Sequence, residues 1–232
     1  RLEEANRVLN EFGKLYKAVG DASGVVPQIS CIMGTCGGGM SIIPAMSDFV
    51  LMKNEGAKFF MNSPDALEGN NAGIEDSSSA EFASEYGVVD FIGTEEEIIS
   101  KARELVTILP NNYEDDTSYN ESTDDPNRLL PGIEQFKDDP QRLIYEIADD
   151  HRYVERRPDY CREIVTAIAQ LDGTTVGFIA NKDITDDDDP TALFTAQGLY
   201  KAAYFIRFCD AFSIPLVSLV NMPGFARTLE SE

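Results

Sequence analysis

The 232-residue chain is poor in basic side chains, and this shortage narrows the range of its partners. Only 19 Lys and Arg stand against 41 Asp and Glu, which leaves a formal net charge of −22 at pH 7. An acidic excess of this size repels phosphate groups, so it argues against nucleic acid and against an anionic membrane surface as partners. No apolar run approaches the roughly 20 residues that a membrane-spanning helix needs, and no basic-then-apolar leader stands at the start.

The chain also has few cysteines, none of them closely spaced, and a single histidine. The four cysteines, Cys31, Cys36, Cys161 and Cys209, are widely spaced and form no C-x-x-C pair, which argues against a metal site or a disulfide framework. We interpret them as buried free thiols of a cytoplasmic protein, because the cytoplasm keeps thiols reduced. The single histidine, His151, lies in a charged stretch, and we interpret it as a surface or packing residue.

What the chain does have is a strand–turn–helix pattern around a run of glycines. Residues 28–33 form a short apolar run typical of a buried strand, and residues 34–39 read G-T-C-G-G-G. Residues 40–46 are apolar again, with Pro44 early enough for the first turn of a helix. Residues 49–52 then predict a second buried strand. A strand, a crossover and a strand form the βαβ unit of a parallel sheet, so we expect an α/β fold.

Local signals predict the other elements. Thr94 and Glu97 form a capping-box pattern at the start of a helix over 94–109, and Asp172-Gly173 is a hairpin turn signal. Apolar spacing predicts helices over 2–19 and 192–212 and strands over 87–92, 162–171, 174–180 and 214–220. The acidic, turn-rich segment 113–130 is predicted to be a solvated linker, which divides the chain into segments 1–112 and 131–232.

The glycine run itself admits two interpretations. Glycine adopts positive φ freely and lets another molecule approach the backbone closely. The first interpretation is a tight turn and nothing more. The second is an anion hole whose donors are backbone N–H groups, of the kind that stabilises an enolate or a tetrahedral oxyanion. A phosphate loop is disfavoured, because the pattern is neither G-x-x-x-x-G-K-[ST] nor G-x-G-x-x-G.

The motifs around this run resemble a known family. The stretch I-M-G-x-C-x-G-G follows P-Q-I-S and precedes P-A-x-x-D-F, and R-F-C-D-A-F and P-G-F occur near the end of the chain. This combination is similar to the carboxyltransferase subunits of biotin-dependent acyl-CoA carboxylases and decarboxylases, of the propionyl-CoA carboxylase beta and methylmalonyl-CoA decarboxylase alpha type. The family's usual G-P-C-A-G-G-A matches here at Gly34, Cys36, Gly38 and Gly39 and differs at residues 35, 37 and 40.

The resemblance implies a fold, a reaction and a set of site residues. It implies the crotonase-like α/β fold, here as two incomplete copies, and transfer of a carboxyl group between biotin and the α carbon of an acyl-CoA. The backbone amides of Gly38 and Gly39 would form the oxyanion hole for the thioester enolate. Coenzyme A would enter as part of the substrate, and no metal is implied. The substrate-binding residues implied by the same motifs, with F-x-x-S-P in place of the family's F-I-T-G-P, are Gly34, Cys36, Gly37, Met40, Ser63 and Pro64.

The same resemblance sets expectations about partners and length. Members of the family carry more sequence on both sides, so we expect the chain to be an internal piece that is inactive alone. Segment 1–112 would belong to the acyl-CoA subdomain and segment 131–232 to the biotin-side subdomain. We expect a biotin carboxyl carrier protein or domain as partner, and a homo-oligomer. The acyl group stays open between propionyl, methylmalonyl, glutaconyl and acetyl.

Several alternatives compete with this hypothesis. A crotonase-fold enoyl-CoA hydratase or isomerase needs glutamate acid/bases, and no Glu lies between Gly24 and Lys53. A Cys36 nucleophile needs a base, and no histidine lies near it in the sequence. The family often has a histidine where this chain has Asp90, so a catalytic histidine is not expected there. A non-catalytic acidic fragment stays open as a description of the isolated chain.

Overall fold

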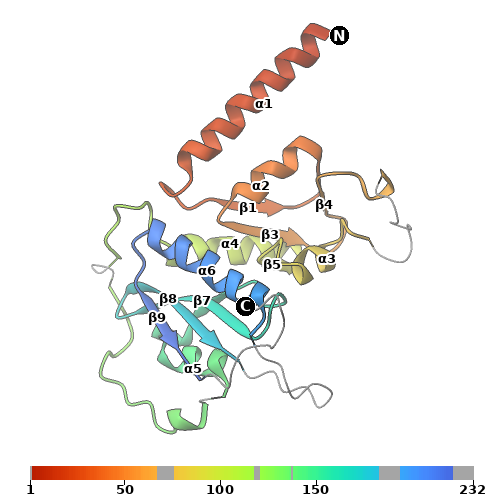
Figure 1. Cartoon of the computed structure of the whole chain (residues 1–232). Coiled ribbons are helices and arrows are strands. Elements are labelled where there is room, and N and C mark those ends of the chain that lie inside the picture. Colours follow the sequence, from red (N-terminus) through yellow and green to blue (C-terminus); the bar gives the residue numbers. More distant parts are fainter. Residues whose placement is uncertain (1, 67–75, 118–120, 137, 183–193, 222–232) are drawn as a thin grey trace. The chain divides into compact units, whose positions relative to one another are not determined.

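A computed structural model of the chain describes residues 2–66, 76–117, 121–136, 138–182 and 194–221. These residues form two compact units, Arg1–Glu104 and Leu105–Glu232, which we call the first and the second unit. Each unit has its own sheet and its own helices (Figure 1). The predicted P-G-F turn near residue 223 lies outside the described residues.

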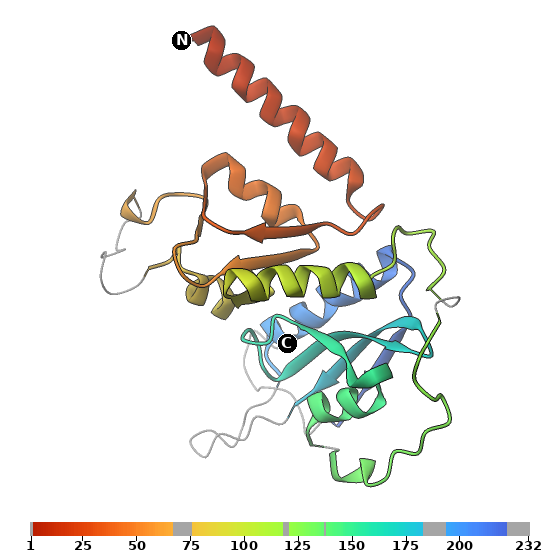
Figure 2. The same ribbon diagram turned by 180° about the vertical axis from the view of Figure 1, so that it is seen from behind.

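The first unit is built on a parallel three-stranded sheet of order β1-β3-β5, with a separate parallel pair formed by β2 and β4. Helix α2 lies above β1 of the three-stranded sheet in both views (Figures 1 and 2). The elements of this unit are α1 (Leu2–Ala22), β1 (Ile29–Ile32), β2 (Thr35–Gly37), η1 (Gly38–Ser41), α2 (Ile42–Met46), β3 (Phe49–Lys53), β4 (Lys58–Phe60), η2 (Pro64–Ala66), α3 (Ala80–Glu85), β5 (Phe91–Gly93) and most of α4 (Glu95–Ile108).

The second unit is built on a mixed four-stranded sheet of order β6-β7-β8-β9, in which only the β8–β9 pair is parallel. Its apolar core lies between this sheet and α5, around Ile144, Val165 and Phe178. The elements are η4 (Ile133–Phe136), α5 (Pro140–Ile147), η5 (Asp149–His151), β6 (Tyr153–Arg156), β7 (Ile164–Leu171), β8 (Thr174–Asn181), α6 (Ala196–Ala211) and β9 (Leu216–Leu219).

Predictions that rest on local chemistry are confirmed. The Thr94 backbone N–H donates to Glu97 Oε2 at 2.8 Å and the Glu97 N–H donates to Thr94 Oγ1 at 3.3 Å, which is a reciprocal capping box. Asp172 and Gly173 both have positive φ, 49° and 76°, as a type I′ hairpin turn requires. The strands on either side pair antiparallel from Leu171↔Thr174 onward.

One predicted strand begins later than expected. The sequence predicts a strand over residues 87–92, but β5 starts at Phe91, because the chain turns at Gly87, whose φ of +68° lies outside the strand range. Asp90 occupies the position of the family's histidine, and its side chain is 3% exposed. Its N–H donates to Val50 O at 2.7 Å, while its Oδ2 accepts from Val50 N–H at 2.8 Å. Asp90 therefore pairs with the backbone of β3 and has a structural role.

The division into two units falls inside α4, ahead of the predicted linker 113–130. The end of α4 and the residues after it bind the second unit's hairpin. Thr175 Oγ1 donates to Ile108 O at 2.6 Å, and Thr175 N–H donates to Thr117 Oγ1 at 3.2 Å. Whether 1–112 and 131–232 are functional subdomains stays a prediction.

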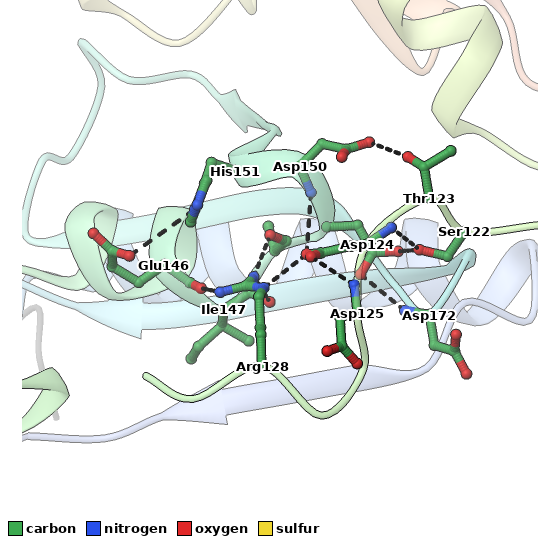
Figure 3. A network of polar contacts seen from close by, with 12 residues as sticks. Ser122, Thr123, Asp124, Asp125, Arg128, Glu146, Ile147, Asp150, His151 and Asp172 are labelled. Atoms are coloured by element: carbon green, nitrogen blue, oxygen red, sulfur yellow. Dashed lines mark hydrogen bonds and ion pairs between the residues drawn. The ribbon is translucent and has the colours of Figure 1, made fainter. Parts of the chain in front are cut away.

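Part of the acidic segment is bound to the second unit by a polar network (Figure 3). Asp124 Oδ2 accepts from Arg128 Nε at 2.8 Å, and Arg128 donates its other N–H groups to the carbonyls of residues 146, 147 and 148 at the end of α5. Ser122 Oγ donates to Asp149 Oδ2 at 2.9 Å. Asp149 also accepts from the backbone N–H groups of Asp172 and residue 173. This stretch is thus held to α5 and to the β7–β8 turn, where the sequence predicted solvated chain.

The single histidine behaves as expected from the sequence. His151 is exposed, its ring stacks on Tyr145 with 4.8 Å between centroids, and its Nδ1 lies 3.0 Å from Tyr145 O. It is a packing residue of the second unit.

Candidate active site

The glycine run lies where β1 of the first unit ends, and it is more ordered than the predicted turn. Residues 35–37 form the short strand β2, which pairs in parallel with β4 so that Cys36 lies opposite Phe59. The Gly34 carbonyl accepts from Lys58 N–H at 3.2 Å. Glycines disfavour strands locally, but pairing with β4, some 23 residues further along the chain by register, supplies the hydrogen bonds.

At each of the three consecutive glycines, a different structural feature disfavours a larger residue. A methyl group on Gly37 would overlap the ring of Phe60. Gly38 has a φ of +60°, which L side chains adopt only with strain. A methyl group on Gly39 would lie 2.8 Å from Tyr16 Oη. The run thus combines close approach at two positions with a left-handed backbone at the third.

The amides of Gly38 and Gly39 begin the 3-10 helix η1. The first N–H groups of a helix have no acceptor within it. The carbonyls of the same two residues are engaged, because Ser41 Oγ donates to Gly38 O and Tyr16 Oη donates to Gly39 O, both at 2.7 Å. A methyl group on Gly38 or Gly34 would meet no heavy atom within 4 Å outside the chain neighbours, so the backbone there is open to a ligand.

Cys36 and Met40 face different surroundings. Cys36 packs against the core cluster that contains Phe59 and Met52, and burial raises the pKa of its thiol. A raised pKa leaves little thiolate, which agrees with rejecting Cys36 as a nucleophile. Met40 is 46% exposed. It lines a groove of about 590 Å³ together with Glu4, Arg7, Val8, Glu11, Phe12 and Leu15 of α1.

The β2–β4 pair brings the segment that contains Ser63 and Pro64 next to the glycine run. Gly37 lies opposite Phe60, and Ser41 Oγ lies 3.7 Å from the sulfur of Met61. Ser63 precedes η2, and its carbonyl accepts from the N–H of residue 66 at 2.9 Å. Pro64–Ala66 form a 3-10 turn, and residues 67–75 lie outside the described residues.

Two residues at the site were assigned no functional role from the sequence. From the sequence, Tyr16 is one of the apolar residues of the amphipathic helix predicted over 2–19. Ser41 belongs to the segment 40–46, which is predicted to begin the helix after the glycines. Both have a hydroxyl group bonded to a glycine carbonyl. The signal available for Ser41 was its position three residues after Gly38, which allows its side chain to bond back to that carbonyl. Tyr16 lies 23 residues away from Gly39 and had no such signal.

The described residues show no arrangement for a metal or a membrane span. Within residues 2–66, 76–117, 121–136, 138–182 and 194–221, no group of three or more His, Cys, Asp or Glu side chains could hold a metal ion. None of the helices in the described part of the chain is both long and apolar enough to cross a membrane.

Comparison with known proteins assigns the fold and the family. The transcarboxylase 12S crystal structure with hydrolyzed methylmalonyl-coenzyme A bound is similar, with a TM-score of 0.84 and 29% identity over 100% of this chain and 46% of that one. This likeness confirms the crotonase-like α/β fold expected from the sequence.

Two curated relatives point to the same family as the similar structure. The propionyl-CoA carboxylase carboxyltransferase subunit of Haloferax mediterranei is 33% identical over 100% of this chain and 46% of its own length. The methylmalonyl-CoA decarboxylase subunit alpha of Veillonella parvula is 35% identical over 97% and 46%. The chain thus spans about half the length of these relatives. The carboxyl transferase domain matches residues 1–232, and the chain belongs to this family.

Proposed function

We propose that this chain forms part of a biotin-dependent acyl-CoA carboxyltransferase and binds the thioester of the acyl-CoA. The amides of Gly38 and Gly39 form the oxyanion hole. The observation that carries the proposal is the glycine loop itself: the carbonyls of Gly38 and Gly39 accept hydrogen bonds from side chains, and the space beside the Cα atoms of Gly34 and Gly38 is open. Family membership supports the same assignment.

The chemistry explains why such a site needs no reactive side chain. Moving a carboxyl group to or from the α carbon passes through a thioester enolate, whose oxygen gains negative charge. Donors already in place stabilise that charge, and removing one typically costs about 2.7 to 4 kcal/mol of transition-state stabilisation. Backbone amides of glycine allow the thioester to come close, because no Cβ stands in its path.

The partners follow from the same proposal. Biotin, carried on a partner protein or domain, supplies or accepts the carboxyl group when bound. Gly37, Met40, Ser63 and Pro64 line the approach of the acyl-CoA in this proposal, and Cys36 supports the loop from the core side. The similar transcarboxylase 12S structure is described as a hexamer with substrate bound, and we propose a homo-oligomer here too.

The test is a matched pair of glycine substitutions. Gly38→Ala places a methyl group in the open space of the proposed site, at a φ of +60°. Gly56→Ala is the control, because it also meets no heavy atom within 4 Å and has a φ of +76°, but it lies between β3 and β4. Both variants carry the same kind of backbone strain, at about 1 kcal/mol.

The assay is transfer of carboxyl from methylmalonyl-CoA or malonyl-CoA to free biotin, in the longest natural form of the protein that contains these residues. We expect Gly38→Ala to lose about 100-fold or more in kcat/KM, the loss seen when one oxyanion donor fails, and Gly56→Ala to stay near wild type. Equal activities of the two variants would refute the placement of the site. Absence of transfer and of acyl-CoA binding by calorimetry in the wild type would refute the function.

A further inference from the structure

Two hydroxyl groups hold the backbone of the glycine loop through its carbonyls. Ser41 Oγ donates to the carbonyl of Gly38, and Tyr16 Oη donates to the carbonyl of Gly39, each at 2.7 Å. Ser41 is 3% exposed and belongs to the same short helix as the glycines. Tyr16 comes from α1. Each of two successive carbonyls therefore accepts from a side-chain hydroxyl, and the Gly39 carbonyl also accepts from the backbone N–H of Ile42.

Holding a carbonyl also sets the direction of the neighbouring amide. A trans peptide is planar, and its C=O and N–H bonds point in opposite directions. The Gly38 carbonyl shares its peptide with the Gly39 N–H, and the Gly39 carbonyl shares its peptide with the Met40 N–H. Ser41 thus orients the Gly39 amide, and Tyr16 orients the Met40 amide that follows it. A hydrogen bond accepted by the carbonyl also polarises the peptide and strengthens its N–H as a donor.

The loop needs such support because it has no side chains of its own. Glycine occupies positive and negative φ about equally, so a Gly-Gly peptide rotates more readily than any other. Gly38 already has a φ of +60°. An oxyanion hole acts only when its donors are oriented before charge develops. The two hydroxyls supply the orientation that glycine lacks.

The surroundings of Tyr16 show that its position is itself defined. Its ring lies 5.8 Å from that of Phe12, one helical turn earlier on α1. Its hydroxyl oxygen would be 2.8 Å from a methyl group on Gly39, so the hydroxyl sits directly over that Cα. On the other side, Ser41 Oγ also lies 3.7 Å from Met61 Sδ. The glycine loop therefore lies between α1 and the end of β4.

We propose that Ser41 and Tyr16 are positioning residues of the oxyanion hole, which orient its amides toward the thioester oxygen through the glycine carbonyls. The inference rests on the proposed function, since it assigns roles within the same site. Neither side chain touches the substrate in this proposal. Ser41 acts on an amide of the hole itself, and Tyr16 acts on the next peptide, so Ser41 carries the larger effect.

The test uses variants that remove only the hydroxyl donors. Tyr16→Phe keeps the ring, Ser41→Ala removes the hydroxyl, and Ser41→Cys keeps the volume but offers only a weak S–H donor. Tyr200→Phe and Ser100→Ala are matched controls, because both residues are exposed and lie on helices α6 and α4. All are made in the longest natural form of the protein and compared at equal folded fraction by thermal unfolding.

Kinetics separate positioning from binding. Loss of an interaction made only with the transition state lowers kcat and leaves KM in place. We expect Ser41→Ala and Ser41→Cys to lower kcat by about 10-fold to 100-fold and Tyr16→Phe by about 3-fold to 10-fold, with KM for the acyl-CoA within about 2-fold. The controls should keep wild-type kcat.

A spectroscopic readout detects the hole directly. Donors aimed at the thioester oxygen polarise its C=O bond, which lowers the carbonyl stretching frequency of bound acyl-CoA in an infrared difference spectrum. We expect this lowering in the wild type and its partial loss in the Ser41 variants. A role confined to stability would change the unfolding temperature and leave the band where it is.

The outcomes distinguish the two proposals. A wild-type protein that neither binds acyl-CoA nor transfers carboxyl refutes the proposed function. A wild-type protein that does both, with Ser41 and Tyr16 variants that keep kcat and the lowered carbonyl band, refutes the positioning role alone. The positioning role is supported if the variants lose kcat and the carbonyl band of bound acyl-CoA shifts toward its frequency in free acyl-CoA.

Discussion

Two sets of contacts, one in each unit, bind backbone polar groups with side chains of opposite charge. In the first unit, Asp48 Oδ2 accepts from Gln28 N–H and Asp90 Oδ2 accepts from Val50 N–H, both at 2.8 Å. In the second unit, Arg128 donates to three carbonyls at the end of α5. Lys201 donates to the carbonyls of residues 157, 160, 161 and 164 at 2.6 to 3.4 Å.

The difference follows from which backbone groups each architecture leaves without a partner. Parallel strands that enter a sheet side by side present N–H groups at their start, and a carboxylate placed just before the next strand accepts them. Helix ends and tight loops present carbonyls instead. The loop before β7 contains two non-glycine residues at positive φ, Arg157 and Cys161, and its carbonyls converge on one ammonium group. Carboxylates of the second unit also accept from N–H groups, as Asp149 does at the hairpin turn and Asp139 does at the start of α5.

The largest effect is expected at Lys201, which is 3% exposed. Lys201→Met keeps the buried length of the side chain and leaves the loop carbonyls without their donor. Removing one member of a buried charged set costs about 3 to 5 kcal/mol, and we expect the free energy of unfolding in urea to fall by that amount. The control Lys14→Met, at an exposed surface pair, should change it by less than about 0.5 kcal/mol. Equal effects at both lysines would contradict the comparison.

The pH dependence of stability gives a second check on Lys201. Burial, partly opposed by Glu155, Cys161 and Glu163, lowers its pKa from 10.5 to about 8. Between these values the unfolded chain holds a proton that the folded chain has released. The contribution of Lys201 to the free energy of unfolding therefore rises as the pH increases through this window. Urea titrations at pH 8 and pH 10 should show this rise in the wild type relative to Lys201→Met, and parallel curves would contradict it.

A smaller loss is expected at Arg128. Arg128→Met leaves three carbonyls and Asp124 without their donor, and we expect the second unit to lose about 2 kcal/mol. Arg128→Lys should recover part of this, because a single ammonium cannot reach three carbonyls in the way that a guanidinium fork does. Arg162→Met is the control, since its side chain is 68% exposed. The free energy of unfolding of each of these three variants, measured in urea against the wild type, checks the prediction.

In the first unit, the stability lost on removing an aspartate should depend on how deeply that aspartate is buried. Asp90→Ala leaves the Val50 N–H buried without its carboxylate, at a cost of about 1 to 3 kcal/mol. Asp48→Ala should cost less, because Asp48 is only half-buried. Asp90→Asn should recover part of the loss through its amide oxygen, which also accepts a hydrogen bond. If Asp90→Asn and Asp90→Ala were equally unstable, the negative charge rather than the acceptor would be what β3 requires.

The smallest effect is expected at Asp76, an exposed carboxylate of the first unit. Its hydrogen bonds from Lys58, and then from Ser78, lower its pKa from 3.8 to about 2. Its contribution to stability is present above pH 4 and is lost as the pH falls from about 4 to about 2. Because the pair with Lys58 is nearly half exposed, solvent screening keeps this contribution below about 1 kcal/mol. Acid titration of wild type against Asp76→Asn measures it, and high salt should abolish the difference.

The local features of the fold were predictable from the sequence because each is decided within a few residues. The capping box at Thr94 and the Asp172-Gly173 turn depend on side chains three or fewer positions apart. The glycine motif was equally informative, since it predicted the fold and the family before any coordinate was known. Strand β2 was not predicted, because glycines surround it and end it at Gly37, and its strand hydrogen bonds come from pairing with β4.

The sequence by itself determined most of the helices and strands, several of the turns between them, and the family to which the chain belongs. Tertiary structure alone decided that Tyr16 meets Gly39 across 23 residues, and that Lys201 meets its carbonyls across 37 to 44 residues. The physical reason is that a pattern of hydrophobicity and turn residues acts over short distances along the chain. A hydroxyl or an ammonium group finds its backbone partner only after folding has brought distant segments together.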